Sequence, residues 1–290
     1  MIVVTGGSGL LGKAILREIK GSKGACRNCE IFLDLRDLDS IKVVMDRVRP
    51  EVVIHAGALS NADYCETNRE EAYLVNYRAS RVLAREAKRL SAFLVFISSD
   101  YVFDGEKGGY VEDDPPNPVN YYGLTKLAAE RAIGEEGGHY AILRTSVIYG
   151  PWEARLKENF ALWIIRNLKE GRGIRLVVDQ ISSPTLNLNL ARMVRETVER
   201  RIESVFHVAG DEAVSRYEFG IRLAETMGLD TSLITQSLTS QMNWVARRPK
   251  NSSLNVDSVK ALFRERSLRL SEALRELRSE LSSKIVINIS

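Results

Sequence analysis

The sequence contains few of the residues that build disulfide frameworks and metal centres. Its 290 residues include only three cysteines and three histidines. A small, odd number of cysteines does not indicate the disulfide framework of a secreted domain. The histidines stand far apart, and no second cysteine pair accompanies Cys26 and Cys29. Because a structural zinc site needs about four ligands, we expect no metal site.

The sequence also lacks a dominant charge and a long hydrophobic run. It has 41 Lys and Arg against 38 Asp and Glu, a net charge of +3, and the basic residues are scattered. We therefore expect neither a nucleic-acid partner nor a membrane partner. Residues Met1–Val4 lead directly into a glycine turn, without the basic start of a signal peptide. We expect a cytoplasmic protein.

Cys26 and Cys29 form a C-x-x-C pair. A redox pair of this type usually opens a helix after a strand. Residues 30–33, which follow the pair, instead have the apolar character of a strand. We interpret the pair as structural or incidental.

Strand-like and helix-like segments alternate through the first half of the chain. Short apolar runs predict strands, and apolar residues at helical spacing predict helices. The expected strands are 2–5, 30–33, 52–55, 93–98 and 141–145, and the expected helices are 11–19, 40–48, 73–90 and 122–135. Strands joined by helices form right-handed units with both sheet faces covered. We predict an α/β fold with a doubly wound, parallel Rossmann sheet.

The second half is less regular. Its expected helices are 159–171, 188–201, 217–227, 257–263 and 271–281, and its expected strands are 174–178 and 205–208. We predict an NAD(P)-binding Rossmann domain over residues 1–150, to which a segment of about 179–210 returns. Residues 151–290 are expected to form mainly a smaller C-terminal substrate-binding region.

A glycine-rich turn follows the first expected strand. It contains Gly6, Ser8, Gly9, Leu10, Leu11 and Gly12. The spacing G-x-x-G-x-x-G allows the backbone to approach a pyrophosphate, which the N–H groups and dipole at the helix start then stabilise. Because the turn follows a strand and opens a helix, it has the context of a dinucleotide-binding loop.

The choice between NADPH and NADH depends on where the second strand ends. If it ends near residues 25–26, Lys23 and Arg27 are cations placed for a 2′-phosphate. If it ends at Leu33, Asp34 is the acid that binds the ribose hydroxyls and favours NAD. The sequence leaves both cofactors open, with NADP slightly favoured.

Tyr122 and Lys126 stand four residues apart at the start of an expected helix, so their side chains share one face. A nearby ammonium lowers the pKa of a phenol from its usual value of about 10. Such a phenol can exchange a proton at a carbinol carbon. Ser98 and Ser99 end an expected strand, at the edge where open α/β sheets bind ligands. The combination predicts a dehydrogenase or reductase.

Several longer stretches add a resemblance to a known family. They are Asp34–Asp37, Arg49–Ala56, Asp63–Glu66, Val75–Asn76, Ser98–Gly105, Asn120–Gly123, Leu143–Ser146, Asn159–Phe160, Asp179–Gln180, Ser183–Thr185 and Arg248–Ser252. Over roughly residues 1–254 the chain resembles the extended short-chain dehydrogenases/reductases and, among them, the dTDP-4-dehydrorhamnose reductases. The stretches Ser98–Gly105 and Arg248–Ser252 are specific to this branch.

The resemblance implies a reaction. Hydride would pass from NADPH or NADH to C4 of a dTDP-4-keto-6-deoxyhexose, and dTDP-4-dehydrorhamnose would become dTDP-L-rhamnose. Tyr122 would protonate the forming alkoxide, and Ser99 would hydrogen-bond the keto oxygen. Lys126 would tune Tyr122 and hold the nicotinamide ribose.

The resemblance also implies the binding residues. The cofactor would contact the glycine turn, Arg27, Asp34, Leu35, Ala56, Gly57, Ala58, Ser98, Tyr122 and Lys126. The nucleotide sugar would contact Ser99, Asp100, Tyr101, Asn159, Gln180 and Arg248. A homodimer is expected by analogy with the family alone. His55 ends a strand, and we expect it to be a packed, hydrogen-bonded residue.

Tyr101 distinguishes this chain from a neighbouring activity. The related sugar-nucleotide 4,6-dehydratases carry an Asp-Glu pair after the Ser or Thr, because the elimination of water needs a further acid and base. Here Asp100 is followed by Tyr101. The missing glutamate favours simple reduction.

Two other functions stay open. Residues Gly9–Gly12 read Gly-Leu-Leu-Gly where the reductases usually have a Gln. This stretch and Ser98–Asp100 also resemble the regulatory β subunit of methionine adenosyltransferase, which binds NADP and works as a partner subunit. A nucleotide-sugar epimerase, or a 4-keto reductase of different stereochemistry, also fits, because the sequence does not reveal how the sugar is oriented.

Overall fold

The computed structural model describes residues 1–152 and 158–287. Its larger part is a seven-stranded sheet in the order β11-β6-β5-β4-β1-β2-β3, and all neighbouring strands are parallel. The strands are β1 (Ile2–Thr5), β2 (Lys23–Cys26), β3 (Ile31–Phe32), β4 (Val52–His55), β5 (Phe93–Ser99), β6 (Tyr140–Thr145) and β11 (Ser204–His207). The predicted Rossmann-type fold is confirmed.

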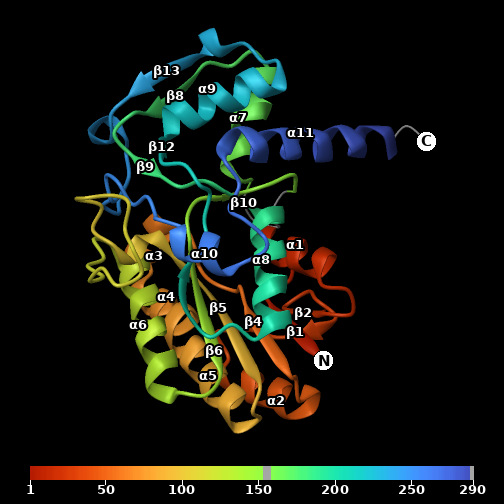
Figure 1. The fold of residues 1–290 in the computed structure, drawn as a ribbon. Helices are drawn as coiled ribbons and strands as arrows, with labels where there is room; N and C mark the ends of the chain where they lie inside the picture. Colours follow the sequence, from red (N-terminus) through yellow and green to blue (C-terminus); the bar gives the residue numbers. More distant parts are fainter. Residues whose placement is uncertain (153–157, 288–290) are drawn as a thin grey trace.

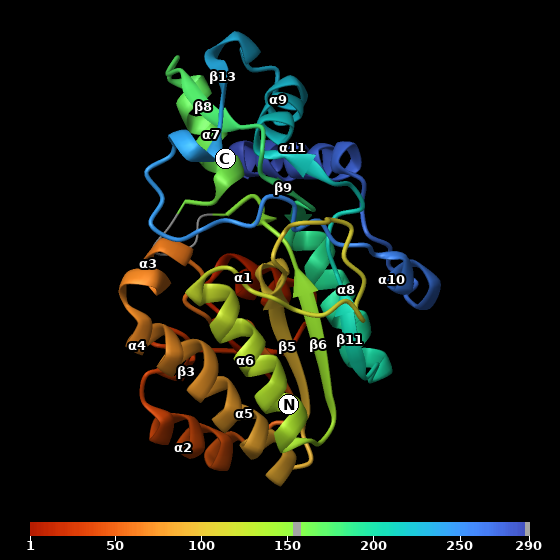
Figure 2. The same ribbon diagram turned by 90° about the vertical axis from the view of Figure 1, so that its left-hand side faces the viewer.

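Helices cover both faces of this sheet (Figure 1, Figure 2). One face packs against α1 (Leu10–Glu18) and α8 (Asn187–Arg200), and the other against α2 (Leu38–Val48), α5 (Ala79–Arg89) and α6 (Tyr121–Glu136). The short helices α3 (Ala62–Thr67), α4 (Arg69–Ala72) and the π-helical η1 (Tyr73–Arg78) lead into α5. Every residue of β4 and β5 is buried, as a sheet covered on both sides requires.

A smaller region lies beyond the carboxyl ends of the main strands (Figure 1). Its helices are α7 (Phe160–Lys169), α9 (Arg216–Met227) and α11 (Leu270–Ile287). Its strand pairs are β7 (Ile148–Tyr149) with β10 (Thr185–Leu186), β9 (Ile181–Ser182) with β12 (Val214–Ser215), and β8 (Ile174–Val177) with β13 (Ile234–Ser237). The remaining short helices are η2 (Asp100–Val102), η3 (Thr231–Leu233), η4 (Thr239–Gln241) and α10 (Asp257–Leu262).

The chain crosses between the two regions more than once. The expected strand at 174–178 belongs to a small separate sheet, whereas the expected strand at 205–208 joins the edge of the main sheet as β11. Helix α8, which precedes β11, packs beside α1 on the main sheet (Figure 1). The second half of the chain therefore supplies helices and strands to both regions.

The strand that decides the cofactor question is split in two. β2 ends at Cys26, so Arg27 follows it directly, and the two-residue β3 adds a further edge strand shortly before Asp34. The two candidate residues, Arg27 and Asp34, thus follow two neighbouring strands, β2 and β3. Lys23 is not placed as expected, because it begins β2 and forms an ion pair with Glu30 at 2.5 Å.

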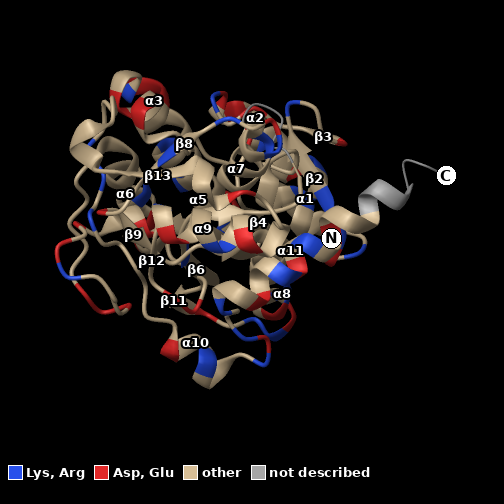
Figure 3. Ribbon diagram, turned by 90° about the horizontal axis from the view of Figure 1, so that it is seen from above, with Lys and Arg blue, Asp and Glu red and all other residues tan. Residues whose placement is uncertain are grey.

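Charges of both signs alternate over the ribbon seen from above (Figure 3). Nothing in this view gathers Lys and Arg into one stripe, in agreement with the scattered basic residues of the sequence. Within the described residues, no helix is long and apolar enough to cross a bilayer.

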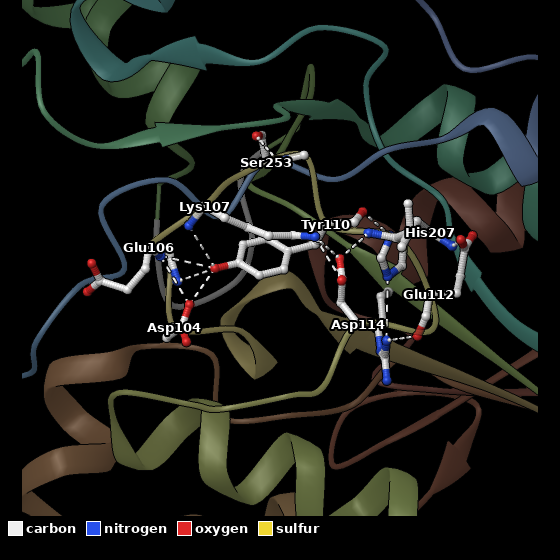
Figure 4. Close-up of polar contacts among 12 residues, drawn as sticks. Asp104, Glu106, Lys107, Tyr110, Glu112, Asp114, His207 and Ser253 are labelled. Atoms are coloured by element: carbon white, nitrogen blue, oxygen red, sulfur yellow. Dashed lines mark hydrogen bonds and ion pairs between the residues drawn. The ribbon is translucent and has the colours of Figure 1, made fainter.

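Tyr110 fixes the long segment between η2 and α6 (Figure 4). Its hydroxyl accepts hydrogen bonds from the backbone N–H groups of Gly105 and Glu106, both at 3.0 Å, and donates one to Asp104. Its carbonyl oxygen lies 2.9 Å from Nδ1 of His207 on β11. One buried tyrosine therefore ties the Asp104–Gly105 turn to the main sheet.

Replacing Tyr110 with phenylalanine is expected to lower the free energy of unfolding by about 1–3 kcal/mol, because partners of the buried hydroxyl lose their hydrogen bonds. Urea unfolding measures this change. Tyr73→Phe is the matched control: its side chain is 42% exposed, and we expect a change below about 0.5 kcal/mol. Equal losses in both variants would contradict the role of the Tyr110 hydroxyl.

Candidate functional site

The glycine turn has a backbone that only glycine permits. Gly6 has φ +69°, and a Cβ placed on it would lie 2.7 Å from the Cα of Gly57. A Cβ on Gly12 would lie 2.2 Å from the carbonyl oxygen of Gly6. Gly9 caps α1, and no side chain caps the first turn of that helix. The first amides of α1 are therefore available to an anion, so the turn fits the pyrophosphate of a dinucleotide.

The ends of β1 and β4 lie beside this turn and are joined by hydrogen bonds. Thr5 Oγ1 accepts a hydrogen bond from the N–H of Gly57 at 3.3 Å and lies 2.6 Å from Nδ1 of His55. Nε2 of His55 lies 3.0 Å from the hydroxyl of Ser80. Burial lowers the pKa of His55 to about 3, so the ring is neutral. The expectation that His55 is a packed, hydrogen-bonded residue is confirmed.

Arg27 and Asp34 lie near each other at the outer end of the same edge. A hydrogen bond from Arg36 is the largest cause that lowers the pKa of Asp34, and the charge of Arg27 adds to it. Arg36 and Asp34 form an ion pair at 2.6 Å, whereas Arg27 is exposed. A Cβ on Gly57 would contact Leu35. The predicted adenosine-binding residues are thus close in space.

Ser99 and Tyr122 meet at the carboxyl end of β5. Ser99 is the last residue of that strand, and Tyr122 lies in the first turn of α6, which Asn120 caps by accepting a hydrogen bond from Gly123 at 2.9 Å. Burial raises the pKa of Tyr122, and the hydrogen bond of Ser99 opposes this rise. Tyr122 is therefore protonated at neutral pH and able to donate its proton.

Lys126 lies one helical turn further along α6 and is buried. Its Nζ donates to the carbonyl of Ile97 at 2.7 Å and lies 3.9 Å from the ring centroid of Phe96. Burial lowers its pKa to about 7. The largest influence on the pKa of Tyr122 is burial, which raises it, and not a neighbouring cation. The expected lowering of the phenol pKa is therefore not found in this arrangement, because burial of Tyr122 has the larger effect.

Asp100 connects Ser99 to two other segments of the chain. It is 2% exposed, and its carboxylate accepts hydrogen bonds from three serines: Ser99 at 3.1 Å, Ser146 at 2.8 Å and Ser252 at 2.6 Å. Burial raises its pKa, and the serine hydrogen bonds oppose this rise. The two sequence stretches that are specific to the branch, around Ser99 and Ser252, thus meet at one carboxylate.

A row of polar groups leads from Tyr122 into the smaller region. The ring of Tyr101 stands edge-on to that of Tyr122, with centroids 5.8 Å apart. Its hydroxyl accepts a hydrogen bond from Gln180 Nε2 at 3.2 Å, and Gln180 Oε1 accepts one from Arg216 Nε at 3.4 Å. Two residues predicted to bind the sugar, Tyr101 and Gln180, are therefore in contact.

Arg216 is a site residue that the sequence analysis missed. Its guanidinium lies 4.7 Å from the ring centroid of Phe160, and no carboxylate in the described part of the chain forms an ion pair with it. Burial lowers its pKa and the charge of Arg248 acts in the same direction, whereas the nearby Tyr101 and Asp100 act against this shift. Arg216 is the first residue of α9, where a cation opposes the helix dipole. That unfavourable position is the signal in the sequence that identifies it.

Arg248 lies on the same side of the site. It forms an ion pair with Asp63 at 2.9 Å, and its guanidinium lies 5.1 Å from the ring centroid of Trp244. Only 12% of its side chain is exposed. Two arginines from different segments are therefore near enough for the charge of one to affect the other.

Two predicted binding residues have structural partners. Both amide hydrogens of Asn159 are used, since Nδ2 donates to the carbonyls of Gly150 and Trp152 at 3.0 Å each, while Oδ1 caps α7. The hydroxyl of Ser98 donates to Glu130, away from the glycine turn. Their contacts with substrate and cofactor stay predictions.

Lys126→Met is expected to make the protein more stable below pH 7, because the wild type then buries a charge. Between the folded pKa of about 7 and the ordinary value of 10.5, the unfolded chain binds the proton and the folded chain does not. The free energy of unfolding of the wild type therefore rises with pH in this window. Its difference from that of Lys126→Met becomes smaller.

Thermal unfolding of Lys126→Met and of the wild type across this pH range measures the difference in stability. The exposed Lys20→Met is the control and should show no such trend. A difference that stays constant with pH would contradict the burial of a charge at Lys126.

Comparisons to known proteins agree with the fold. The family described as "RmlD substrate binding domain" matches residues 1–283. Methionine adenosyltransferase 2 subunit beta of Xenopus tropicalis is 32% identical over 90% of this chain and 81% of its own length. The probable low-salt glycan biosynthesis reductase Agl14 of Haloferax volcanii is 31% identical over 88% of this chain and 90% of its own.

A solved structure has nearly the same fold. The dTDP-4-dehydrorhamnose reductase of Bacillus anthracis, in complex with NADP, superposes with a TM-score of 0.90 at 29% identity, over 96% of this chain and 98% of its own. The chain belongs to the RmlD substrate-binding domain family of extended short-chain dehydrogenases/reductases, the nucleotide-sugar reductase family.

Proposed function

We propose that the chain is an NAD(P)H-dependent reductase of the 4-keto group of a dTDP-4-keto-6-deoxyhexose, which converts dTDP-4-dehydrorhamnose to dTDP-L-rhamnose. The observation that carries the proposal is that Ser99 at the end of β5 and Tyr122 in the first turn of α6 lie at one edge, with Ser99 on Asp100 and Tyr122 edge-on to the adjoining Tyr101. The glycine turn beside them fits a dinucleotide. The reductase of Bacillus anthracis with nearly the same fold was solved with NADP.

The dinucleotide binds along the carboxyl edge of the main sheet. Its pyrophosphate lies on residues 6–12, and residues 56–58 after β4 line its other side. The exposed Arg27 binds the 2′-phosphate, which favours NADPH, while Asp34 is engaged by Arg36. Residues 1–150, together with about 179–210, form this cofactor-binding part, and residues 151–290 form mainly the substrate-binding part.

The chemistry follows from the protonation states of the site. When bound, the reduced nicotinamide supplies a hydride to C4 of the keto sugar. Tyr122 donates its proton to the oxygen that becomes an alkoxide, and Ser99 donates a hydrogen bond to the same oxygen. In the structure the Ser99 hydroxyl donates its one proton to Asp100 at 3.1 Å, so it turns from Asp100 to the keto oxygen when the sugar binds. Lys126 places a cation beneath the reacting groups when it is protonated.

The diphosphate of the nucleotide lies between the two arginines. Arg248 comes from the C-terminal segment, and Arg216 from the start of α9. Guanidinium groups bind phosphate oxygens well because they present paired N–H donors. Asn159 and Gln180 border the same space. An anionic ligand relieves the mutual repulsion of the two cations.

Tyr122→Phe is expected to lower kcat by at least about a hundredfold, because the proton donor is lost. The readout is the consumption of NADPH or NADH with dTDP-4-keto-6-deoxy-L-mannose. Tyr121→Phe is the matched control, since this neighbouring ring faces Arg69 and should retain activity. Turnover by Tyr122→Phe equal to that of the wild type would refute the assignment.

Arg216→Met is expected to raise KM for the nucleotide sugar by roughly tenfold to a hundredfold, because the diphosphate loses one charged hydrogen-bonding partner. The Kd for NADPH should be unchanged. Arg222→Met, on the same helix and paired with Glu212 at 2.7 Å, is the control. An unchanged KM in Arg216→Met would exclude Arg216 from the substrate site.

A second candidate rests on the curated relatives. Methionine adenosyltransferase 2 subunit beta matches 90% of this chain, which supports a regulatory subunit that binds NADP and a synthetase. Size-exclusion chromatography with the methionine adenosyltransferase of the same organism distinguishes the two functions. A stable complex without turnover of any keto sugar would favour the subunit. A homodimer and a cytoplasmic location stay predictions.

A further inference from the structure

The structure joins Cys26 and Cys29 in a disulfide bond, which the sequence did not indicate. Cys26 is the last residue of β2, and Cys29 lies in the turn before β3. The bond closes a loop whose two inner residues, Arg27 and Asn28, are both exposed. The cross-linked loop therefore carries the cation that we assign to the 2′-phosphate.

The disulfide packs directly on the glycine turn. A Cβ placed on Gly7 would lie 3.1 Å from Sγ of Cys29, and one on Gly24 would lie 3.4 Å from the same sulfur. Both bonded cysteines are partly accessible. The third cysteine, Cys65, is fully buried, and burial raises the pKa of its thiol to about 11. Of the three cysteines, only the bonded pair is therefore accessible, and it lies at the proposed cofactor edge.

Apart from the disulfide, the pairing of β2 with β3, Ala25 with Ile31 and Cys26 with Phe32, holds the base of this loop, and few other contacts of the described residues reach its tip. The N–H groups of Cys29 and Leu33 both donate to the single carbonyl of Cys26, at 3.3 and 3.2 Å. The ion pair of Lys23 with Glu30 lies at the surface, where such pairs contribute little. Because these constraints are weak, breaking the disulfide would release Arg27 from its fixed position.

We propose that Cys26 and Cys29 form a reversible redox site, reduced by a small dithiol or dithiol protein, that sets the affinity of the chain for NADPH. The proposal rests on the proposed function, because it needs a dinucleotide at this edge. A fixed loop loses less conformational freedom on binding than a loose one. The oxidised form should therefore bind the 2′-phosphate more tightly.

The exchange balances without any further reactant. One thiolate of the dithiol attacks a sulfur of the Cys26–Cys29 bond, which breaks as a mixed disulfide forms. The second thiol of the reductant then displaces the protein sulfur and leaves as a cyclic disulfide. Two electrons and two protons are transferred, so both cysteines end as thiols. Disulfides in a reducing cytoplasm are characteristically catalytic or redox-sensing.

The experiment compares the oxidised and the dithiothreitol-reduced wild type by titration with NADPH and with NADH. Thiol titration in denaturant verifies the states, since the chain has three cysteines and reduction adds two thiols to the one of Cys65. We expect the Kd for NADPH to rise roughly threefold to tenfold on reduction. The Kd for NADH should change by less than about twofold, because NADH lacks the 2′-phosphate.

The double variant Cys26→Ser, Cys29→Ser is the control. It should resemble the reduced wild type and should not respond to dithiothreitol, which excludes an effect through Cys65. Equal NADPH affinity in both redox states would overturn the proposal and leave the disulfide a structural bond. Equal weakening for both cofactors would exclude action through Arg27. Failure of both redox forms to bind either cofactor would refute the proposed function itself, a result distinct from the others.

Discussion

The buried carboxylate of Asp100 is the constraint on which the site depends. A carboxylate withdrawn from water requires hydrogen-bond donors, and here they are three serine hydroxyls. Ser99 comes from the end of β5, Ser146 from the turn after β6, and Ser252 from the C-terminal segment. The main sheet and the C-terminal segment are thereby fixed to each other beneath the hydroxyl that faces Tyr122.

Burial also sets the chemistry of the groups above this carboxylate. Tyr122 keeps its proton because the anion would be poorly solvated, and Lys126 holds its charge weakly for the same reason. Charges in such surroundings act strongly on one another. Arg216 and Arg248, which we assign to the substrate, extend the pattern, since each is largely withdrawn from water. A ligand that is both anionic and polar suits these surroundings.

The sequence predicts well those features that depend on local spacing. The glycine turn, the Tyr122–Lys126 pair and the alternation of strands and helices each follow from residues close in the chain. It does not predict contacts between distant segments, such as Ser252 with Asp100 or Arg216 with Gln180. The disulfide also escaped prediction, because a C-x-x-C pair between β2 and the edge strand β3 has no local signature that separates bonded from free cysteines.

The most direct test of the account follows the hydride itself. NADPH carrying deuterium at the transferable position of its nicotinamide is incubated with the protein and a dTDP-4-keto-6-deoxyhexose, and the sugar product is examined by NMR. The account predicts deuterium at C4 of the hexose and a hydroxyl in place of the ketone. Binding of the labelled cofactor without any deuterium in the sugar would contradict it and would favour a regulatory subunit.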